Sequence, residues 1–452
     1  MQSLHFFHLR HFHNDSRAPG VAGGCTRGGT TTSNSCSCTE KIKRITPPPC
    51  QQTTRTPSRN DTSIKFFLYS PSEFPSFWGE TSTCDHSKTM SIKHDHEEFA
   101  YNAMKRHPWR TSNPCEAQIA FLPLSFNLWK RNGCDNRKMD PTMIRCEIEL
   151  ALNSTGIFPH IRHVVLLNDW KVINDRDVDY ILEAIKPALI QVRMEGRSDC
   201  VISHGYTSNN EVFNSLRNPN DFDLPDNSKT GDQRIYSVHM VGSILERASH
   251  GHRIALFTNN THSEIPNNPF IIAPYSNGKI HQGLRPCNIS SSADLKMGDH
   301  DRCMLPEGVD SISRTLSQHT QEESNYTLCL RGDTLGSDRW INGIVAGTAL
   351  IQVIASEDDW NWLPFPDLIP WKKIVITIWE DDFLKDPAGS IRKVIETTSE
   401  DRLLKLQELS RYYAADLDWM AHNSRVLENL IHDAMSVPCR AFDAKPKLET
   451  TQ

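Results

Sequence analysis

A glycine-containing turn flanked by arginines is the strongest candidate for chemistry in this sequence. Arg331 and Gly332 follow a short apolar run, residues 327–330, and precede a helical pattern that starts near Ser337. Glycine lets the backbone approach a ligand closely, and the unpaired N–H groups and dipole of the following helix attract an anion. Arg331 and Arg339 could each donate two hydrogen bonds to a diphosphate. The pattern therefore predicts a diphosphate site, with an ordinary connecting turn as the alternative.

Three carboxylates are weaker candidates for contacting a substrate or accepting its proton. Asp169 ends an apolar run at residues 163–167, where it would be an acceptor-side carboxylate or a helix cap. Glu380 and Asp382 follow another apolar run, residues 374–378, and would contact donor hydroxyls or form a solvated acidic turn. A general base is normally such a carboxylate or a histidine. The sequence leaves the catalytic residue unknown.

No metal site is predicted. Cys36 and Cys38 have no histidines nearby at zinc-ligand spacing. Residues 94–98, which read HDHEE, have the composition of metal ligands, but no partner cluster accompanies them, and they are expected to start a solvated helix. His107 and Arg110 are expected to anchor the N-terminal half structurally. Four tryptophans are expected to pack in the interior, namely Trp340, Trp360, Trp362 and Trp371.

Composition and charge narrow the class of protein. The chain has 452 residues, of which 38% are hydrophobic and 23% charged, which is typical of a soluble globular protein of two or three domains. Its formal net charge is -6 and its basic residues are dispersed, so a nucleic-acid partner is not expected. The 13 cysteines are compatible with a disulfide-forming lumen. The sequence contains neither a recognisable signal peptide nor an apolar run approaching the roughly 18 residues of a membrane span.

The order of apolar runs predicts an α/β protein, because strands and helices alternate as they do around parallel sheets. Residues 1–62 are rich in Ser, Thr, Gly and Pro and are expected to be disordered. Two domains are expected at 63–250 and 251–440, with a flexible tail at 441–452. Strands are predicted at 64–69, 119–124, 163–167, 189–192, 253–257, 327–330, 349–354 and 374–378. Helices are predicted at 97–105, 142–152, 175–185, 236–248, 338–346, 390–398, 401–413 and 416–435.

A resemblance to a known family extends over most of the chain. Residues 329–351 read CLRGDTLGSDRWINGIVAGTALI. In order and spacing they resemble a signature of exostosin-like glycosyltransferases, CPRG followed by S-P-R-L-V-E-A-I and then G-C-I-P-V-I. Four further blocks resemble family blocks and occur in the family's order, so the resemblance spans about residues 64–435. These blocks lie at residues 107–124, 163–170, 253–275 and 371–382.

The resemblance implies a GT-B fold, an α/β architecture in which two Rossmann-like domains with parallel sheets face a central cleft. The N-terminal domain would bind a glycan or glycoprotein acceptor, and the C-terminal domain a nucleotide-diphosphate sugar. The implied reaction is inverting transfer of the sugar to a glycan hydroxyl. It would use no metal or other cofactor, because a helix N-terminus and basic side chains neutralise the leaving diphosphate. The resemblance also implies the Golgi or secretory pathway and homo- or hetero-oligomers with related transferases. The implied donor-binding residues are Arg331, Gly332, Ser337, Arg339 and Asn342.

Two departures from the family pattern define an alternative function. Asn342 stands where the family has the acidic residue that holds the donor ribose, so a charge-assisted hydrogen bond is lost. The apolar strand that opens the family's C-terminal domain has no counterpart between residues 275 and 326. The alternative is a catalytically impaired descendant that binds glycans or acts as a scaffold.

Overall fold

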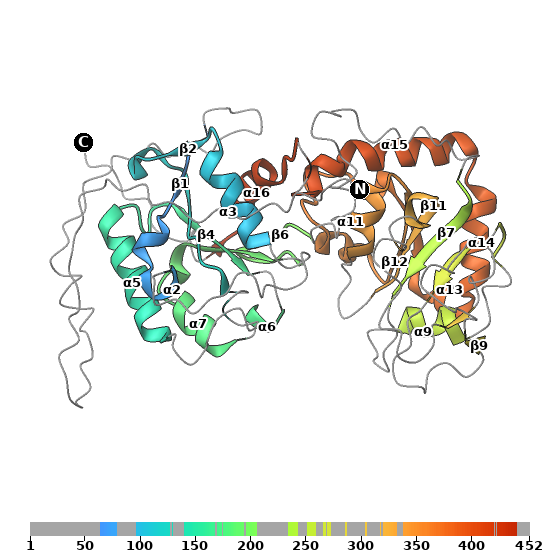
Figure 1. Cartoon of the computed structure of the whole chain (residues 1–452), viewed down its shortest axis with the longest axis horizontal. Helices are drawn as coiled ribbons and strands as arrows, with labels where there is room; N and C mark the ends of the chain where they lie inside the picture. Colours follow the sequence, from blue (N-terminus) through green and yellow to red (C-terminus); the bar gives the residue numbers. More distant parts are fainter. Residues whose placement is uncertain are drawn as a thin grey trace, which may run out of the picture.

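The computed structural model contains two large parallel sheets, which lie in separate halves of the molecule (Figure 1). Every pairing within these two sheets is parallel, which confirms the predicted α/β architecture of two domains with parallel sheets. The structure describes residues 64–78, 96–126, 129, 140–167, 170–173, 175–193, 196–205, 234–242, 251–258, 265–267, 269–272, 285–286, 303–304, 317, 320–331, 338–419, 421 and 423–440. The regions predicted to be disordered, 1–62 and 441–452, lie outside these residues.

The first sheet has the strand order β2-β1-β3-β4-β5-β6. One face packs on α2, α5 and α7, and the other packs on α3 and α16. The strands are β1 (Phe66–Leu68), β2 (Arg110–Thr111), β3 (Ile119–Phe121), β4 (Arg162–Leu167), β5 (Leu189–Arg193) and β6 (Val201–Ser203). The helices are α2 (Pro75–Trp78), α3 (His96–Arg106), α5 (Pro141–Thr155), α6 (Trp170–Ile173), α7 (Arg176–Leu182) and α16 (Val426–Ser436). Short 3-10 turns are η1 (Pro71–Glu73), η4 (Pro114–Glu116) and η6 (Lys186–Ala188).

The second sheet has the strand order β13-β12-β11-β7-β8. Helices α9, α13 and α14 cover one face, and α11 and α15 cover the other. The strands are β7 (Tyr236–Val241), β8 (Phe270–Ile272), β11 (Ser324–Cys329), β12 (Ala349–Ile354) and β13 (Val375–Trp379). The helices are α9 (Gly251–Thr258), α11 (Asp338–Val345), α12 (Trp371–Ile374), α13 (Glu380–Lys385), α14 (Pro387–Thr397) and α15 (Glu400–Leu417), with the 3-10 helix η11 (Glu357–Trp362). A separate pair joins β9 (Arg285–Pro286) to β10 (Cys303–Met304).

A glycine allows α11 to lie close on the second sheet. A Cβ atom added to Gly343 would be 2.7 Å from Cδ2 of Leu350 and 2.9 Å from Cβ of Thr327. Glycine in a helix interior costs about 1 kcal/mol relative to alanine. The close packing of the helix against β11 and β12 explains why it is nevertheless present. The position of α11 fixes where its first turn, and therefore Arg339, meets the sheet.

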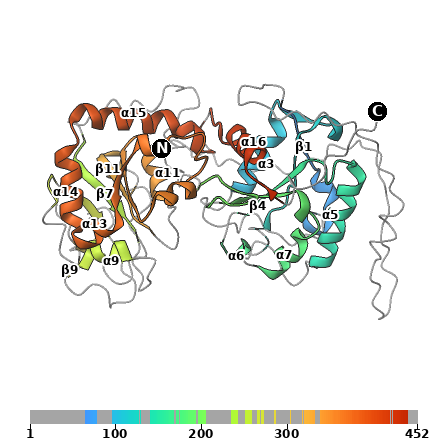
Figure 2. The same cartoon turned by 180° about the vertical axis from the view of Figure 1, so that it is seen from behind.

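The last helix, α16, returns to the first domain (Figures 1 and 2). Nη1 of Arg162 donates to the carbonyl oxygens of Ala434, Met435 and Val437 at 2.8, 2.8 and 2.9 Å, which satisfies the carbonyls at the helix end. A disulfide between Cys200 and Cys439 fastens the segment beyond the helix to the start of β6. Helix α16 is therefore part of the first domain's core.

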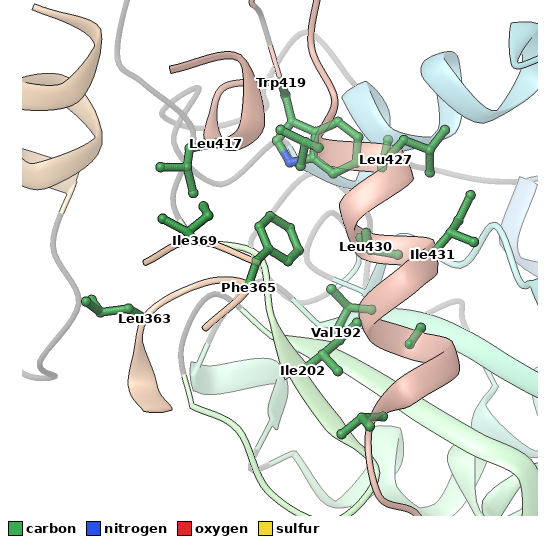
Figure 3. Close-up of a cluster of buried hydrophobic side chains, with 14 of the residues drawn as sticks. Val192, Ile202, Leu363, Phe365, Ile369, Leu417, Trp419, Leu427, Leu430 and Ile431 are labelled. Atoms are coloured by element: carbon green, nitrogen blue, oxygen red, sulfur yellow. The ribbon is translucent and has the colours of Figure 1, made fainter. Parts of the chain in front are cut away.

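One apolar cluster continues from the first domain into the second (Figure 3). Val192 and Ile202 of the first sheet and Leu430 of α16 belong to the same cluster as Phe365 and Leu417 of the second half. Arg197 adds an ionic bridge across the same region, because it lies 2.6 Å from Asp367 and 3.1 Å from Asp433 of α16. The two halves are thus packed together as well as connected by the chain.

Two secondary-structure predictions are wrong, and they are neighbours. The predicted helix at 236–248 begins as strand β7, and the predicted strand at 253–257 lies in helix α9. Tyr236, Val238 and Val241 have the β-branched or aromatic side chains that suit a strand, and burial between β8 and β11 selects that state. β7 precedes residue 275, so it is not the strand that the family pattern places between residues 275 and 326. The chain therefore passes from the first sheet to the second between residues 203 and 236, whereas the domain limit at 250 stays a prediction.

Most other predicted elements are found within a few residues, but the last helix begins later than expected. The helix predicted over 416–435 is α16, and the chain before it, from Asp418 to Arg425, makes the crossing between the two halves. Among the described helices, none is both long and apolar enough to span a membrane.

Candidate functional site

The strand order of the second sheet places a topological switch point between β7 and β11. From β7 the chain runs through α9 to β8 on one side, and from β11 it runs through α11 to β12 and β13 on the other. In open parallel sheets, ligands bind beyond the carboxyl ends of the two strands where the winding direction changes. Here those ends are Val241 with Gly242, and Leu330 with Arg331. The fold alone therefore selects these positions as the candidate site.

Arg339 crosses the switch point from the first turn of α11. Its Nε donates to the carbonyl oxygen of Val241 at 2.5 Å, and its own carbonyl oxygen accepts a hydrogen bond from Gln321 at 3.1 Å. A Cβ atom on Gly242 would lie only 2.1 Å from Nη2 of Arg339, so the guanidinium rests directly on that glycine. Arg339 therefore holds β7 to α11, and its charge is fixed at the predicted diphosphate position.

Arg331 is the other predicted arginine. It follows directly on Leu330 beyond the end of β11, and its side chain is exposed. It lies near enough to His252 of α9 to influence the protonation of that ring electrostatically. Arg331, beyond the end of β11, and Arg339, bonded to the end of β7, thus lie on the two sides of the switch point, where an anion could bind between these strands.

His252 is a site residue that the sequence analysis missed. Its Nε2 atom lies 2.5 Å from Oε1 of Glu380, which begins α13 directly after β13. Burial lowers the pKa of His252, the hydrogen bond and charge of Glu380 oppose this, and the charges of Arg331 and Arg253 lower the pKa further. The partners are 128 residues apart, so no local spacing could have revealed the pair.

The other predicted site residues have different outcomes. Asn342 lies on α11, three residues after Arg339 and thus on a neighbouring part of the same helix surface, and it is half-buried. Asp382 is exposed in the first turn of α13, so it is not brought into the His252–Glu380 pair. Three predicted residues lie outside the described residues: Asp169, Gly332 and Ser337.

Helices that follow β1 and β3 in the first domain carry two buried carboxylates that are bonded to serines. Oγ of Ser125 donates to Oε2 of Glu97 at 2.5 Å. Ser76 donates through both its N–H and its hydroxyl to Glu147, and burial raises the pKa of Glu147 against the lowering effect of these bonds. Glu97 lies in the segment that was expected to start a solvated helix, but its side chain is only 8% exposed. That expectation is therefore wrong for Glu97, because the residue faces Ser125 rather than solvent.

Most residues that were expected to have structural roles are buried or make hydrogen bonds within the fold. Nε2 of His107 lies 3.0 Å from Oε1 of Glu428 on α16, and an Arg110 guanidinium N–H donates to the carbonyl of Lys105 at 3.1 Å. Three of the tryptophans are buried, namely Trp340, Trp360 and Trp371. Trp362 packs over Gly196 of the first domain but is 47% exposed, so it lies at the surface rather than in the interior. No cluster of metal-ligating side chains occurs within the described part of the chain.

Comparison with known proteins gives weak structural likenesses only. No family model and no curated sequence matches the chain. Anabaena Alr3699/HepE, solved with UDP, is 9% identical over 82% of this chain and 100% of that chain, with a TM-score of 0.35. Arabidopsis thaliana UGT89C1, solved with quercetin, is 12% identical over 76% and 77%, with a TM-score of 0.29. An alpha-glucosyltransferase solved with UDP-glucose and abasic-site DNA is 10% identical over 81% and 98%, with a TM-score of 0.35. Likeness at this level carries no argument about activity, and the fold assignment rests on the two parallel sheets.

Proposed function

We propose that this chain is an exostosin-like glycosyltransferase that moves a sugar from a nucleotide-diphosphate donor to a glycan hydroxyl. The observation that carries the proposal is the basic switch point of the second sheet. There, Arg331 and Arg339 flank the carboxyl ends of β7 and β11. A diphosphate is the part of the donor that such a site fits best, because both arginines offer several N–H donors to its oxygens.

The finer features of the reaction follow from the resemblance and belong to the proposal. The first domain would bind a glycan or glycoprotein acceptor, and the transfer would invert the anomeric configuration without a metal ion. The arginines would stabilise the negative charge that develops on the leaving diphosphate. Nuclear magnetic resonance of the first-formed product tests inversion, and activity in EDTA tests metal independence.

The Cys200–Cys439 disulfide supports a location in the Golgi or the secretory pathway, since such bonds persist in oxidising compartments. Cys115 and Cys146 are disulfide-bonded as well. Association with itself or with related transferases is a further part of the proposal. Mass photometry of the purified protein would measure it.

Calorimetry with nucleoside diphosphates tests the donor site directly. We expect UDP or GDP to bind the wild-type chain, and Arg331→Ala to weaken that binding by about tenfold or more, because a charge-assisted contact is lost. The matched control is Arg176→Ala, which removes an exposed arginine from α7 of the first domain. Turnover of a nucleotide sugar in a transfer assay would complete the case.

Glycan binding without any nucleotide binding would instead favour the glycan-binding or scaffolding descendant. Asn342 favours this second function, because it replaces the acidic residue that holds the donor ribose in the family. Asn342→Asp is therefore informative, because it would restore the family's acidic residue on α11. A gain in nucleotide affinity on this substitution would indicate a weakened donor site, whereas no binding by either form would contradict the proposed function.

A further inference from the structure

The two nitrogens of the His252 ring have unequal surroundings. Nε2 is paired with Oε1 of Glu380 at 2.5 Å, and the ring packs edge-on against Phe383 with centroids 5.8 Å apart. Nδ1 is buried and has no hydrogen-bond partner among the residues that the structure describes, and the side chain as a whole is only 5% exposed. Buried polar atoms are almost always hydrogen-bonded, so an exception requires an explanation.

The position of the ring suggests a ligand as that explanation. His252 lies on α9, the helix that follows β7, and Glu380 follows β13, so both residues belong to the carboxyl edge of the sheet. Arg331 follows β11 at the same edge and acts electrostatically on the ring. An unpaired nitrogen beside a switch point and an arginine is a suitable contact for an anionic ligand.

Charge determines which form of the ring is present before a ligand binds. The charged groups that act on it are Glu380 from α13, Arg331 from the end of β11 and Arg253 from α9. Burial and the two arginines lower the pKa of His252 in opposition to Glu380. The ring is therefore neutral at pH 7, with the proton on Nε2 shared with the carboxylate and a lone pair on Nδ1.

A bound diphosphate reverses this balance. Its oxygens only accept hydrogen bonds, so they repel the Nδ1 lone pair but would accept from a protonated Nδ1. Its negative charge also offsets the effect of Arg331, which favours the imidazolium.

We infer that His252 is a ligand of the nucleotide's diphosphate and that it takes up one proton from solvent as the nucleotide binds. Glu380 is the positioning residue, because it orients the ring through Nε2. The inference rests on the proposed donor site. The proton ends on Nδ1 and returns to solvent when the nucleotide leaves, and no covalent bond to the nucleotide is made or broken.

Calorimetry of the full chain with UDP and GDP in Hepes and in Tris at pH 7 tests this inference. The two buffers release protons with different enthalpies, so the difference in observed heat gives the number of protons taken up. We expect close to one proton for the wild type and close to none for His252→Gln, with affinity reduced about tenfold by loss of a charge-assisted contact. The control His160→Gln removes an exposed histidine of the first domain and should match the wild type.

Glu380→Gln provides a second, independent variant. It keeps a hydrogen-bond acceptor but removes the charge that stabilises the imidazolium, so proton uptake should fall while nucleotide still binds. Thermal unfolding without nucleotide identifies any variant that has lost its fold.

Three results would overturn the inference, and they differ in what they imply for the donor site. If nucleotide binds with equal proton uptake in the wild type and His252→Gln, the role of His252 is wrong and the donor site stands. If His252→Gln lowers the affinity but the wild type takes up no proton, the ring accepts a hydrogen bond from a hydroxyl group, and the inference is also wrong. If no nucleoside diphosphate binds the wild type, the inference and the proposed function both fail.

Discussion

The two sheets share parallel winding but differ in the side chains of the segments that follow β1 and β3 in one and β7 and β11 in the other. After β1 and β3 the first domain has Glu97 on α3 and Glu147 on α5, both bonded to serines. At its switch point the second sheet has Arg331 and Arg339. The proposed donor site depends on this difference, because a diphosphate would be bound by basic side chains.

The largest expected effect concerns the disulfide that fastens the segment after α16 to the first sheet. Replacing Cys200 and Cys439 together by alanine should lower the free energy of unfolding by about 2–5 kcal/mol. Nucleotide affinity, a property of the second sheet, should change by less than about twofold below the new unfolding temperature. Denaturant unfolding and calorimetry measure the two quantities. An equal loss of both would mean that the two regions are not separable.

A smaller effect concerns Asp433, where the two halves meet. Burial raises the pKa of Asp433 to about 6. The positive charge of Arg197 lowers this pKa, and the negative charge of Asp367 raises it. Oδ1 is 3.1 Å from Arg197 but lacks hydrogen-bond geometry, so burial prevails. The folded state therefore holds more protons than the unfolded state between about pH 4 and 6.

Stability should accordingly fall as the pH rises through that window, by on the order of 3 kcal/mol at most. Asp433→Asn should abolish this slope, whereas Asp358→Asn, at an exposed position, should retain it. Denaturant midpoints at pH 4, 5, 6 and 7 measure the effect. A slope that survives in Asp433→Asn would show that other carboxyl groups with a raised pKa, such as Glu147, cause it.

Gly242→Ala tests the position of Arg339 at the switch point of the second sheet. The new Cβ would displace the guanidinium of Arg339 and weaken its bond to Val241, at a cost of about 1–3 kcal/mol. Nucleotide affinity should fall with it. Gly251→Ala is the matched control, because a Cβ there has nothing within 4 Å. Unchanged affinity in Gly242→Ala would remove Arg339 from the donor site.

The smallest expected effect is at the first sheet. Glu97→Gln should leave nucleotide affinity within about twofold of the wild type, since the residue lies in the other domain. Ser125→Ala is a companion variant, because it removes the donor that holds the carboxylate. If either substitution weakens nucleotide binding as strongly as Arg331→Ala, the proposal that the second domain alone binds the nucleotide is wrong.

Sequence patterns predicted the parts of the fold in which local preference and burial agree. The apolar runs at 163–167 and 349–354 became β4 and β12, because continuous apolar residues suit strands buried on both faces. β7 was missed because Ser237 and His239 interrupt its apolar pattern, and only its place between β8 and β11 makes it a strand. Arg331 and Arg339 could be proposed from spacing, whereas His252 and Glu380 meet only after folding.

The return of α16 to the first domain has a consequence for biosynthesis. One face of the first sheet, including Phe66 and Val164, is covered in part by α16, which is translated after the second domain. During synthesis, α3 is the only described helix that covers this apolar face until the second domain has been made. Contacts of such wide sequence separation form slowly, and exposed apolar surface favours aggregation. The nascent first domain therefore needs protection from aggregation until α16 has been made.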